Sequence, residues 1–353
     1  MPLLADTSSI ITNQFSLFFI AFLLATTFSF LLAPVFRWIA LRYNILDHPS
    51  SNIKTHQQST PYLGGCAIAL AFILSLTISR YLSDYPPGLL RPIQGIFFGG
   101  FLVFLLGLVD DIVLGGLSYK KKFLIQIAAS SVLLFYGIHI QFAQPRWLAF
   151  ILTVIWITGV MNAVNIIDIM DGLAAGTALI AALAFLFISL PTEQFYVNLT
   201  AGALAGACFG FLPYNFSKNQ KMFMGDTGSL FIGFILGSLS LGTSYTTFHN
   251  AGVLAPILIL GVPIYDTFFV MYLRYKKGMS PFLGSKDHFA LRLEKMGLDR
   301  AYIVSLAIYT TLFLSTCAWL TTIIWFWWAV TIYAVILILA ISISYWLSKV
   351  KID

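Results

Sequence analysis

The sequence predicts an all-α integral membrane protein with about eleven transmembrane helices. Three observations lead to this fold class. The chain of 353 residues is 59% hydrophobic and only 10% charged. Uncharged apolar stretches of about 20 residues recur along it, a length that matches a hydrocarbon core ~30 Å thick. The basic residues, finally, are concentrated in alternate loops, as in multi-pass membrane proteins.

Each predicted helix is an apolar run bounded by charged or turn-forming residues. The first follows a stretch that contains Asp6 but no Lys or Arg. That stretch therefore lacks the basic region of a cleaved signal peptide, and we expect the first helix to be retained as a membrane anchor. Aromatic WFWW at 325–328 separates the last two helices, as is typical of a membrane interface. The predicted helices are centred near residues 26, 70, 101, 130, 156, 181, 206, 238, 262, 312 and 336.

The basic residues predict how the chain is oriented, because Lys and Arg remain on the cytoplasmic side of short loops. Seventeen of the 20 fall on one side, and the other side keeps Arg80, Arg91 and Arg146. We therefore expect the N-terminus outside and the C-terminus in the cytoplasm. Residues 1–353 would form one domain in the inner membrane. Its cytoplasmic loops would span about residues 41–61, 110–121, 166–172, 215–228 and 275–301.

Acidic residues gather on the same side. Eleven of the fourteen belong to predicted inner loops or inner helix ends. Six of these come from four segments, namely Asp110, Asp111, Asp168, Asp171, Asp226 and Asp266. A carboxylate near lipid is costly unless it faces protein, water or a cation. Asp171 or Asp226 alone could cap a helix, but caps do not explain the whole set. The six acids therefore predict a divalent cation or bound phosphates.

The stretch MNAVNIIDIMDGLAAG, residues 161–176, predicts a polar ridge at the inner surface. Asn162, Asn165 and Asp168 are spaced by three residues and would share one helix face. Asp171 begins the next helix. Amide and carboxylate groups of this kind could line a cytoplasmic cleft. Oxygen ligands favour Mg²⁺ or Mn²⁺ over zinc.

Basic side chains are expected on the same surface. LSYKKKF at 117–123 opens the fourth helix, where Lys122 would point back at the aspartates. NIKTHQQSTPYLGG at 52–65 places Lys54 and His56 before the second helix, and SPFLGSKDHFALRL at 280–293 adds His288 and Arg292. The alternative is that such residues only determine topology. That alternative is favoured for Lys120, Lys121, Lys276 and Lys277.

Four motifs resemble those of a known family. NAVNIIDIMDGLAAG resembles an NxxNxxDGxDGLA signature, GLVDD an aspartate doublet, and FMGDTGSL a GDxGS motif. DHPSSNIKTHQQSTPYLGG is similar to an entry loop. Together, from about residue 47 to 300, they resemble the polyprenyl-phosphate N-acetylaminosugar-1-phosphate transferases. Within that family the chain looks more like the WecA and TagO branch than the MraY translocases.

The resemblance implies transfer of a sugar 1-phosphate from a UDP-N-acetylhexosamine, such as UDP-N-acetylglucosamine, to undecaprenyl or another polyprenyl phosphate. UMP would be released, and lipid-linked glycan synthesis would begin. Mg²⁺ or Mn²⁺ is implied, with Asp226 as the metal ligand and Asp171 assisting it. The implied catalytic residues are Asp110, Asp111, Asp168, Asp171 and Lys122. The implied substrate-binding residues are Lys54, His56, Asn162, Asn165, Asp266, His288 and Arg292.

Two points stay open. Asp110 or Asp111 could position the lipid phosphate and take its proton in a single displacement, or one of them could attack phosphorus itself. We favour the single displacement, because a phosphate monoester with a second pKa of ~6 is already mostly a dianion.

Three residues differ from the family motifs. Ala290 and Leu291 replace family histidines, and Ile169 replaces a glycine. A UDP-acetamido-deoxyhexose or UDP-MurNAc-pentapeptide therefore remains an alternative donor.

Other functions are disfavoured. An ion-coupled transporter would distribute acids through the membrane midplane, whereas here they collect at one face. The net charge of +6 follows from the inner loops and requires no nucleic acid as a partner.

Cys66, Cys208 and Cys317 are expected to be free thiols. The expected partners are polyprenyl phosphate, a UDP-sugar and membrane lipids, with a homodimer left open.

Overall fold

The computed structural model describes residues 2–47, 59–82, 85, 88–113, 115–192, 194–243, 245, 250–281 and 284–352. Within α1, side chains are described from Ser16 onward. A helix lies at each of the eleven predicted centres. These helices are α1 (Pro2–Arg42), α2 (Gly64–Leu82), α3 (Leu90–Ile112), α4 (Tyr119–Phe135), α5 (Arg146–Ile167), α6 (Leu173–Ser189), α7 (Phe195–Phe216), α8 (Gly225–Gly242), α10 (Gly261–Lys276), α12 (Arg300–Ile323) and α13 (Phe326–Ser348).

Short elements connect the long helices. They are β1 (Leu46–Asp47), β2 (Thr60–Pro61), η1 (Leu190–Thr192), η2 (Asn250–Leu254), α9 (Ala255–Ile259) and α11 (Phe289–Lys295). β1 and β2 pair antiparallel, with Leu46 opposite Pro61. This pair of two-residue strands, which the all-α prediction did not include, joins the two ends of the entry loop.

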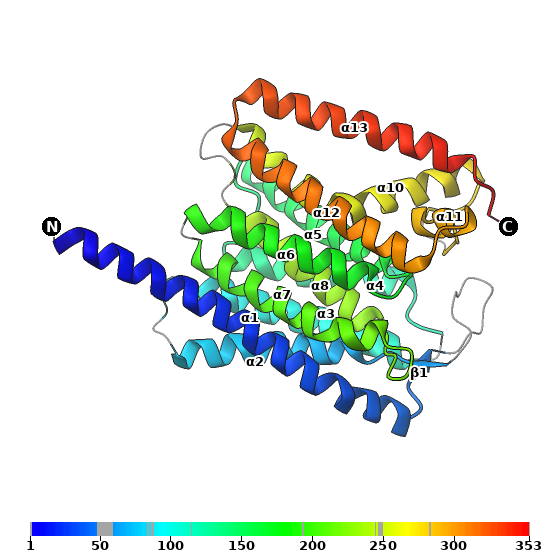
Figure 1. Ribbon diagram of the computed structural model, residues 1–353, viewed down its shortest axis with the longest axis horizontal. Coiled ribbons are helices and arrows are strands. Elements are labelled where there is room, and N and C mark those ends of the chain that lie inside the picture. The colour runs from blue at the N-terminus through cyan, green and yellow to red at the C-terminus, as the bar shows by residue number, and fades with distance from the viewer. Residues whose placement is uncertain are drawn as a thin grey trace.

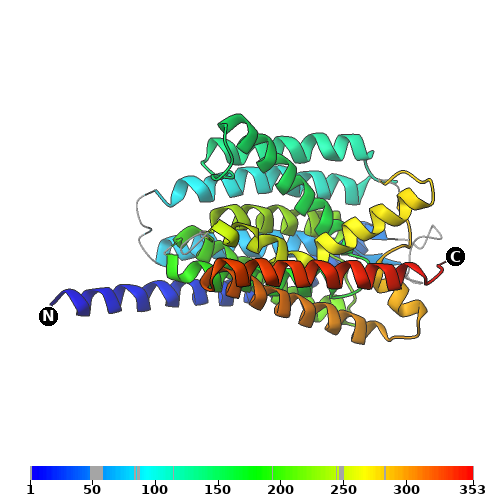
Figure 2. The ribbon, with the colours of Figure 1, turned by 90° about the horizontal axis from the view of Figure 1, so that it is seen from above.

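Seven of the described helices are long and apolar enough to cross a membrane. The number becomes eight if residues 250–276, which bend by 73° at a break, count as one span. The all-α, multi-pass prediction is therefore confirmed, while the number of crossings and the orientation stay predictions. In both views the long helices run along a common axis, with the two termini at opposite ends (Figures 1 and 2).

The centre and the edge of the bundle differ in burial. Within the most apolar 18-residue stretch of each helix, 83% of the residues of α7 are buried within the protein, against 6% of those of α13. α13 accordingly lies at the edge of the bundle in Figure 1. A helix that is apolar all round can lie there because lipid, not water, surrounds it.

Small residues bring α3 unusually close to the start of α8. A Cβ atom on Gly107 of α3 would lie 2.4 Å from the Cα atom of Thr227. Gly225, the first residue of α8, has φ +69°, and a Cβ there would lie 2.5 Å from a carboxylate oxygen of Asp111. Glycine is needed at both positions because any side chain would separate the two helices. This contact brings the end of α3 to the start of α8.

Candidate active site

Three aspartates meet where α3 ends and α8 begins. Asp110, Asp111 and Asp226 each offer a carboxylate oxygen, and these atoms lie within 4.8 Å of one another. Asp111 is buried, whereas the side chain of Asp226 is 26% exposed. Asp226 is therefore more open to a ligand than Asp111.

Asp111 serves as an N-terminal cap for α8. Its carboxylate accepts hydrogen bonds from the backbone N–H groups of Asp226 (2.9 Å) and Thr227 (3.0 Å). The Thr227 hydroxyl also donates to it, at 2.5 Å. The first N–H groups of a helix lack partners within the helix, and a carboxylate there is stabilised by the helix dipole. Asp111 thus fixes the position of Asp226 relative to α3.

Lys122, in the first turn of α4, lies between the other two acids. Its ammonium group is 2.7 Å from Asp110 Oδ2 and 2.5 Å from Asp226 Oδ2. The second oxygen of Asp110 accepts the backbone N–H of Leu117 at 2.6 Å. The expectation that Lys122 points back at the aspartates is therefore met. When all three carboxylates are ionised, one ammonium leaves two negative charges uncompensated, and a divalent cation would balance them.

α5 supplies the amide groups expected on its inner turns. Asn165 Nδ2 donates to Asp226 Oδ1 and to the Ser229 hydroxyl, both at 2.9 Å. Asn162 Nδ2 donates to Oε1 of Gln126 at 2.7 Å and to the carbonyl of Thr158 at 2.8 Å. Asn165 thus belongs to the acid cluster itself, whereas Asn162 contacts a neighbouring helix.

Asp168 and Asp171 lie in the turn between α5 and α6. Burial, with Asp226 and Asp171 nearby, raises the pKa of Asp168 to about 8. Asp171 forms an ion pair with Lys221 at 2.6 Å, and both side chains are 30% exposed. Asn215 holds this turn by accepting the N–H of Gly172. Asp171 is therefore placed beside a lysine, and its expected part in metal binding stays a prediction.

The loop between α10 and α11 is joined to α10 by a buried Asp–His pair. The Nδ1 atom of His288 lies 2.7 Å from Asp266 Oδ2, and the other Asp266 oxygen accepts the N–H of Phe289 at 2.9 Å. Asp266 is fully buried and His288 is 5% exposed. Asp266 thus orients the imidazole ring, and its expected contact with substrate stays a prediction.

Arg292 is surrounded by protein groups. The residue is 2% exposed, and its guanidinium donates to Asp287 Oδ1 at 2.6 Å. It also donates to the carbonyls of Leu347 and Val350 at the end of α13. Burial alone would raise the pKa of Asp287, but hydrogen bonds from Lys277 and Arg292 lower it below its ordinary value. This arrangement favours a structural role for Arg292 over the expected grip on a phosphate.

The remaining expected residues, Lys54 and His56, lie outside the described part of the chain. Gln126, Lys221 and Asn215, which contact Asn162, Asp171 and Gly172, were not predicted from the sequence. Gln126 could have been recognised as an uncharged polar residue within an apolar helix, four positions after Lys122. Lys221 and Asn215 carry no comparable pattern, because nothing local shows which residues they meet.

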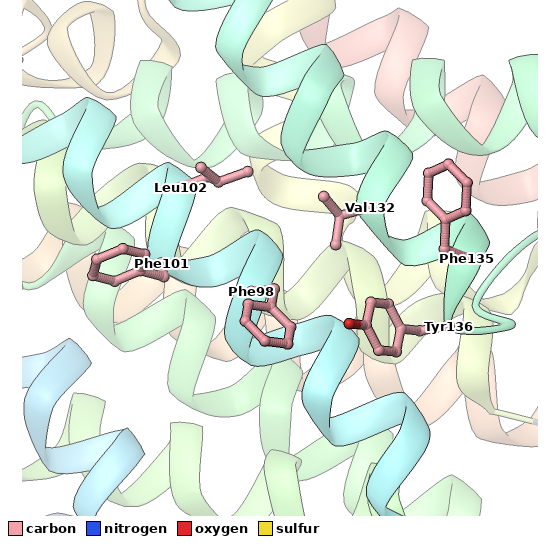
Figure 3. A pocket seen from close by; sticks show the side chains of 6 residues that line it. All are labelled: Phe98, Phe101, Leu102, Val132, Phe135 and Tyr136. Atoms are coloured by element: carbon pink, nitrogen blue, oxygen red, sulfur yellow. The ribbon is translucent and has the colours of Figure 1, made fainter.

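An aromatic groove between α3 and α4 lies apart from these acids. Its walls are formed by Phe98, Phe101, Leu102, Val132, Phe135 and Tyr136 (Figure 3). The lining offers one tyrosine hydroxyl and no charged group. The groove is therefore lined by apolar groups and lacks the charged groups that a nucleotide sugar or a cation requires.

A multi-pass membrane bundle whose helix ends gather carboxylates, a lysine and amides has the features of a membrane enzyme that acts on phosphates. Comparison with known proteins agrees. Residues 93–244 match the model of glycosyl transferase family 4. A Bacillus subtilis (strain 168) protein named "Probable undecaprenyl-phosphate N-acetylglucosaminyl 1-phosphate transferase" is 33% identical over 299 residues, which cover 82% of this chain and 80% of the relative. The chain therefore belongs to glycosyl transferase family 4.

Two further relatives are similar over most of their length. A "Decaprenyl-phosphate N-acetylglucosaminephosphotransferase" of Mycolicibacterium smegmatis is 31% identical over 293 residues, covering 74% of this chain and 71% of the relative. A "Phospho-N-acetylmuramoyl-pentapeptide-transferase" of Prochlorococcus marinus is 30% identical over 306 residues, covering 77% and 82%. The names of these relatives thus include two different sugars.

Proposed function

We propose that this protein transfers an N-acetylaminosugar 1-phosphate from a UDP-sugar to a polyprenyl phosphate and releases UMP. The names of the relatives support this reaction class. The observation that carries the proposal is the meeting of Asp110, Asp111, Asp226 and Lys122 at the ends of three helices. Two anionic substrates must approach each other, and positive charge at this place lowers the repulsion between them.

The three aspartates fit a divalent cation. Their oxygens lie close together, they come from two helices, and one lysine cannot balance all three carboxylates when these are ionised. Asp226 is the principal ligand in this proposal, with Asp110 and Asp111 beside it. When bound, Mg²⁺ would withdraw charge from the diphosphate of the donor. Asp168 and Asp171, on the neighbouring turn, would orient that diphosphate.

We favour a single displacement. An oxygen of the lipid phosphate attacks the sugar-linked phosphorus, and the bond to the bridging oxygen breaks as UMP leaves with the electron pair. Lys122 would neutralise charge on the phosphates. Attack by the doublet is disfavoured because Asp111 is 4% exposed and both its oxygens accept hydrogen bonds. Both oxygens of Asp110 are also engaged, with Leu117 and Lys122.

We propose N-acetylglucosamine as the sugar, because two of the similar relatives are named for it. The muramoyl-pentapeptide donor remains the second candidate, since a relative with that name is 30% identical. Incubating membranes that contain the protein with a panel of UDP-sugars and undecaprenyl phosphate, and identifying the lipid product by its mass, distinguishes the two. A product containing muramoyl-pentapeptide would contradict our choice of sugar but leave the reaction class intact.

We further propose eleven membrane crossings in the inner membrane, with the N-terminus outside and the acid cluster at the cytoplasmic face. The distribution of basic residues supports this orientation. A cysteine introduced at Gln144 should react with an impermeant reagent added to intact cells, and one at Lys218 should not. Labelling at Lys218 would contradict the orientation. Cross-linking in the same membranes tests for a homodimer.

The test of the acid cluster is Asp226→Asn. The substitution keeps the shape of the side chain but removes its charge, so Mg²⁺-dependent transfer should be abolished while the protein still folds. Asp299→Asn is the matched control, because Asp299 is exposed and precedes α12, where asparagine caps equally well. Near-normal turnover and unchanged Mg²⁺ dependence in Asp226→Asn would exclude Asp226 as the principal ligand.

A further inference from the structure

We propose that Gln126 is a positioning residue that holds Lys122 in the acid cluster by means of a reciprocal amide pair with Asn162. Gln126 lies on α4 and is fully buried. Asn162 Nδ2 donates to its Oε1 at 2.7 Å, and Gln126 Nε2 donates back to Asn162 Oδ1 at 3.4 Å. This inference rests on the proposed function, because it concerns how Lys122 acts in that reaction.

The amide pair fixes α4 against α5. A buried amide within a membrane bundle is costly unless its donors and acceptors are paired, so each partner constrains the other. One turn further along, the Ser130 hydroxyl donates to the carbonyl of Gln126 at 2.8 Å and lies 3.4 Å from the Thr158 hydroxyl. The Gln126–Asn162 and Ser130–Thr158 contacts both hold the same face of α4 against α5, so they fix the rotation of α4 about its axis. Apolar contacts permit such a rotation more readily than paired amides do.

Both halves of the pair lie one helical turn from a residue that contacts Asp226. Gln126 is four residues after Lys122, whose ammonium group is 2.5 Å from Asp226 Oδ2. Asn162 is three residues before Asn165, whose amide is 2.9 Å from Asp226 Oδ1. The pair therefore sets the separation of the two groups that approach Asp226 from opposite helices.

Just before the end of α4 that carries Lys122, the backbone N–H of Leu117 donates to Asp110 Oδ1 at 2.6 Å, which ties this end to α3, while the amide pair ties it to α5. Ser118, at the N-cap position, makes no side-chain capping bond. Lys122 must reach Asp110 and Asp226 at once, and a small rotation of α4 would lengthen one of these contacts. This assignment also changes the role of Asn162, whose amide hydrogens are used by Gln126 and Thr158. Asn162 then acts through Gln126 and not on substrate.

The test begins with Gln126→Met, which keeps the length of the side chain and removes its hydrogen bonds. A displacement of Lys122 by about 1 Å should lower kcat roughly a hundredfold, with little change in KM. The swap Gln126→Asn with Asn162→Gln restores both partners and should recover most of the activity. Gln94→Met is the control, because Gln94 is exposed on α3, far from the acids.

A second measurement separates positioning from general unfolding. In native membranes, Lys122 should react faster with an amine-modifying reagent in Gln126→Met than in the wild type, while the paired Lys221 should not change. An equal rise at both lysines would mean that the variant unfolds, and unchanged Lys122 reactivity would mean that the pair does not hold it. Either result overturns the proposal. If the wild type itself transfers no sugar phosphate, the reaction class fails, while the lysine measurement still tests the pair.

Discussion

Gly107→Ala offers a direct test of how closely α3 must approach α8. The added Cβ would lie 2.4 Å from Thr227 Cα, 2.5 Å from Thr227 N and 2.7 Å from the carbonyl carbon of Asp226. Carbon atoms in good contact are ~3.5 to 4.0 Å apart. All three neighbours are backbone atoms, so no side chain can rotate away. The two helices must therefore separate by about 1 Å.

The expected loss of activity corresponds to ~2.7 kcal/mol of activation free energy, more than the expected loss of stability. Overpacking of this kind costs ~1 to 3 kcal/mol, and replacing glycine by alanine in a helix returns ~1 kcal/mol. A net destabilisation of roughly 0 to 2 kcal/mol remains. Moving Asp226 about 1 Å from Asp110 and Lys122, however, should lower kcat about a hundredfold.

The assay compares Gly107→Ala with Gly159→Ala in purified protein. Gly159 lies on α5, and a Cβ added there would meet no atom within 4 Å outside its own helix backbone and its chain neighbours, so alanine should leave turnover unchanged and stability equal or higher. Transfer from a UDP-sugar to polyprenyl phosphate and thermal unfolding are measured on both variants. Turnover of Gly107→Ala within about twofold of the wild type, far from the loss that a misplaced site requires, would refute the argument that this contact sets the geometry of the acids.

Three further outcomes are expected. The raised pKa of Asp168, about 8, means that the folded protein keeps a proton that the unfolded chain loses above ~pH 4. Thermal stability in EDTA should therefore fall as the pH rises toward 8, and less steeply in Asp168→Asn; parallel curves would contradict the shift. Delipidated enzyme should not exchange labelled UMP into UDP-sugar, and exchange that is lost in Asp110→Asn or Asp111→Asn would favour an aspartyl intermediate. Arg292→Met takes from Asp287 its buried partner but leaves Lys277, and should cost ~1.5 to 3 kcal/mol of stability at unchanged KM; a rise in KM without loss of stability would restore a phosphate-binding role.

The local pattern of hydropathy and charge was sufficient to predict the helix positions, the placement of the acidic residues and the direction of one lysine. The eleven predicted centres all fall within helices because an apolar run in lipid must satisfy its backbone hydrogen bonds internally. Asp110, Asp111 and Asp226 lie at helix ends, as expected, since a carboxylate in the apolar interior would be costly; Asp266 lies within α10 and is paired there with His288. The direction of Lys122 could also be predicted, because a helix fixes which residues share its face.

Only the tertiary structure decided which groups meet. Asp111 caps a helix that begins more than a hundred residues later in the chain, and no local pattern distinguishes it from Asp110. Arg292 has the same charge as a phosphate-binding arginine, yet its partners are Asp287 and the carbonyls of Leu347 and Val350 around the end of α13. Side chains acquire such partners when helices distant in sequence pack together. Composition and spacing specify which groups are available, whereas the packing of the helices specifies which of them become neighbours.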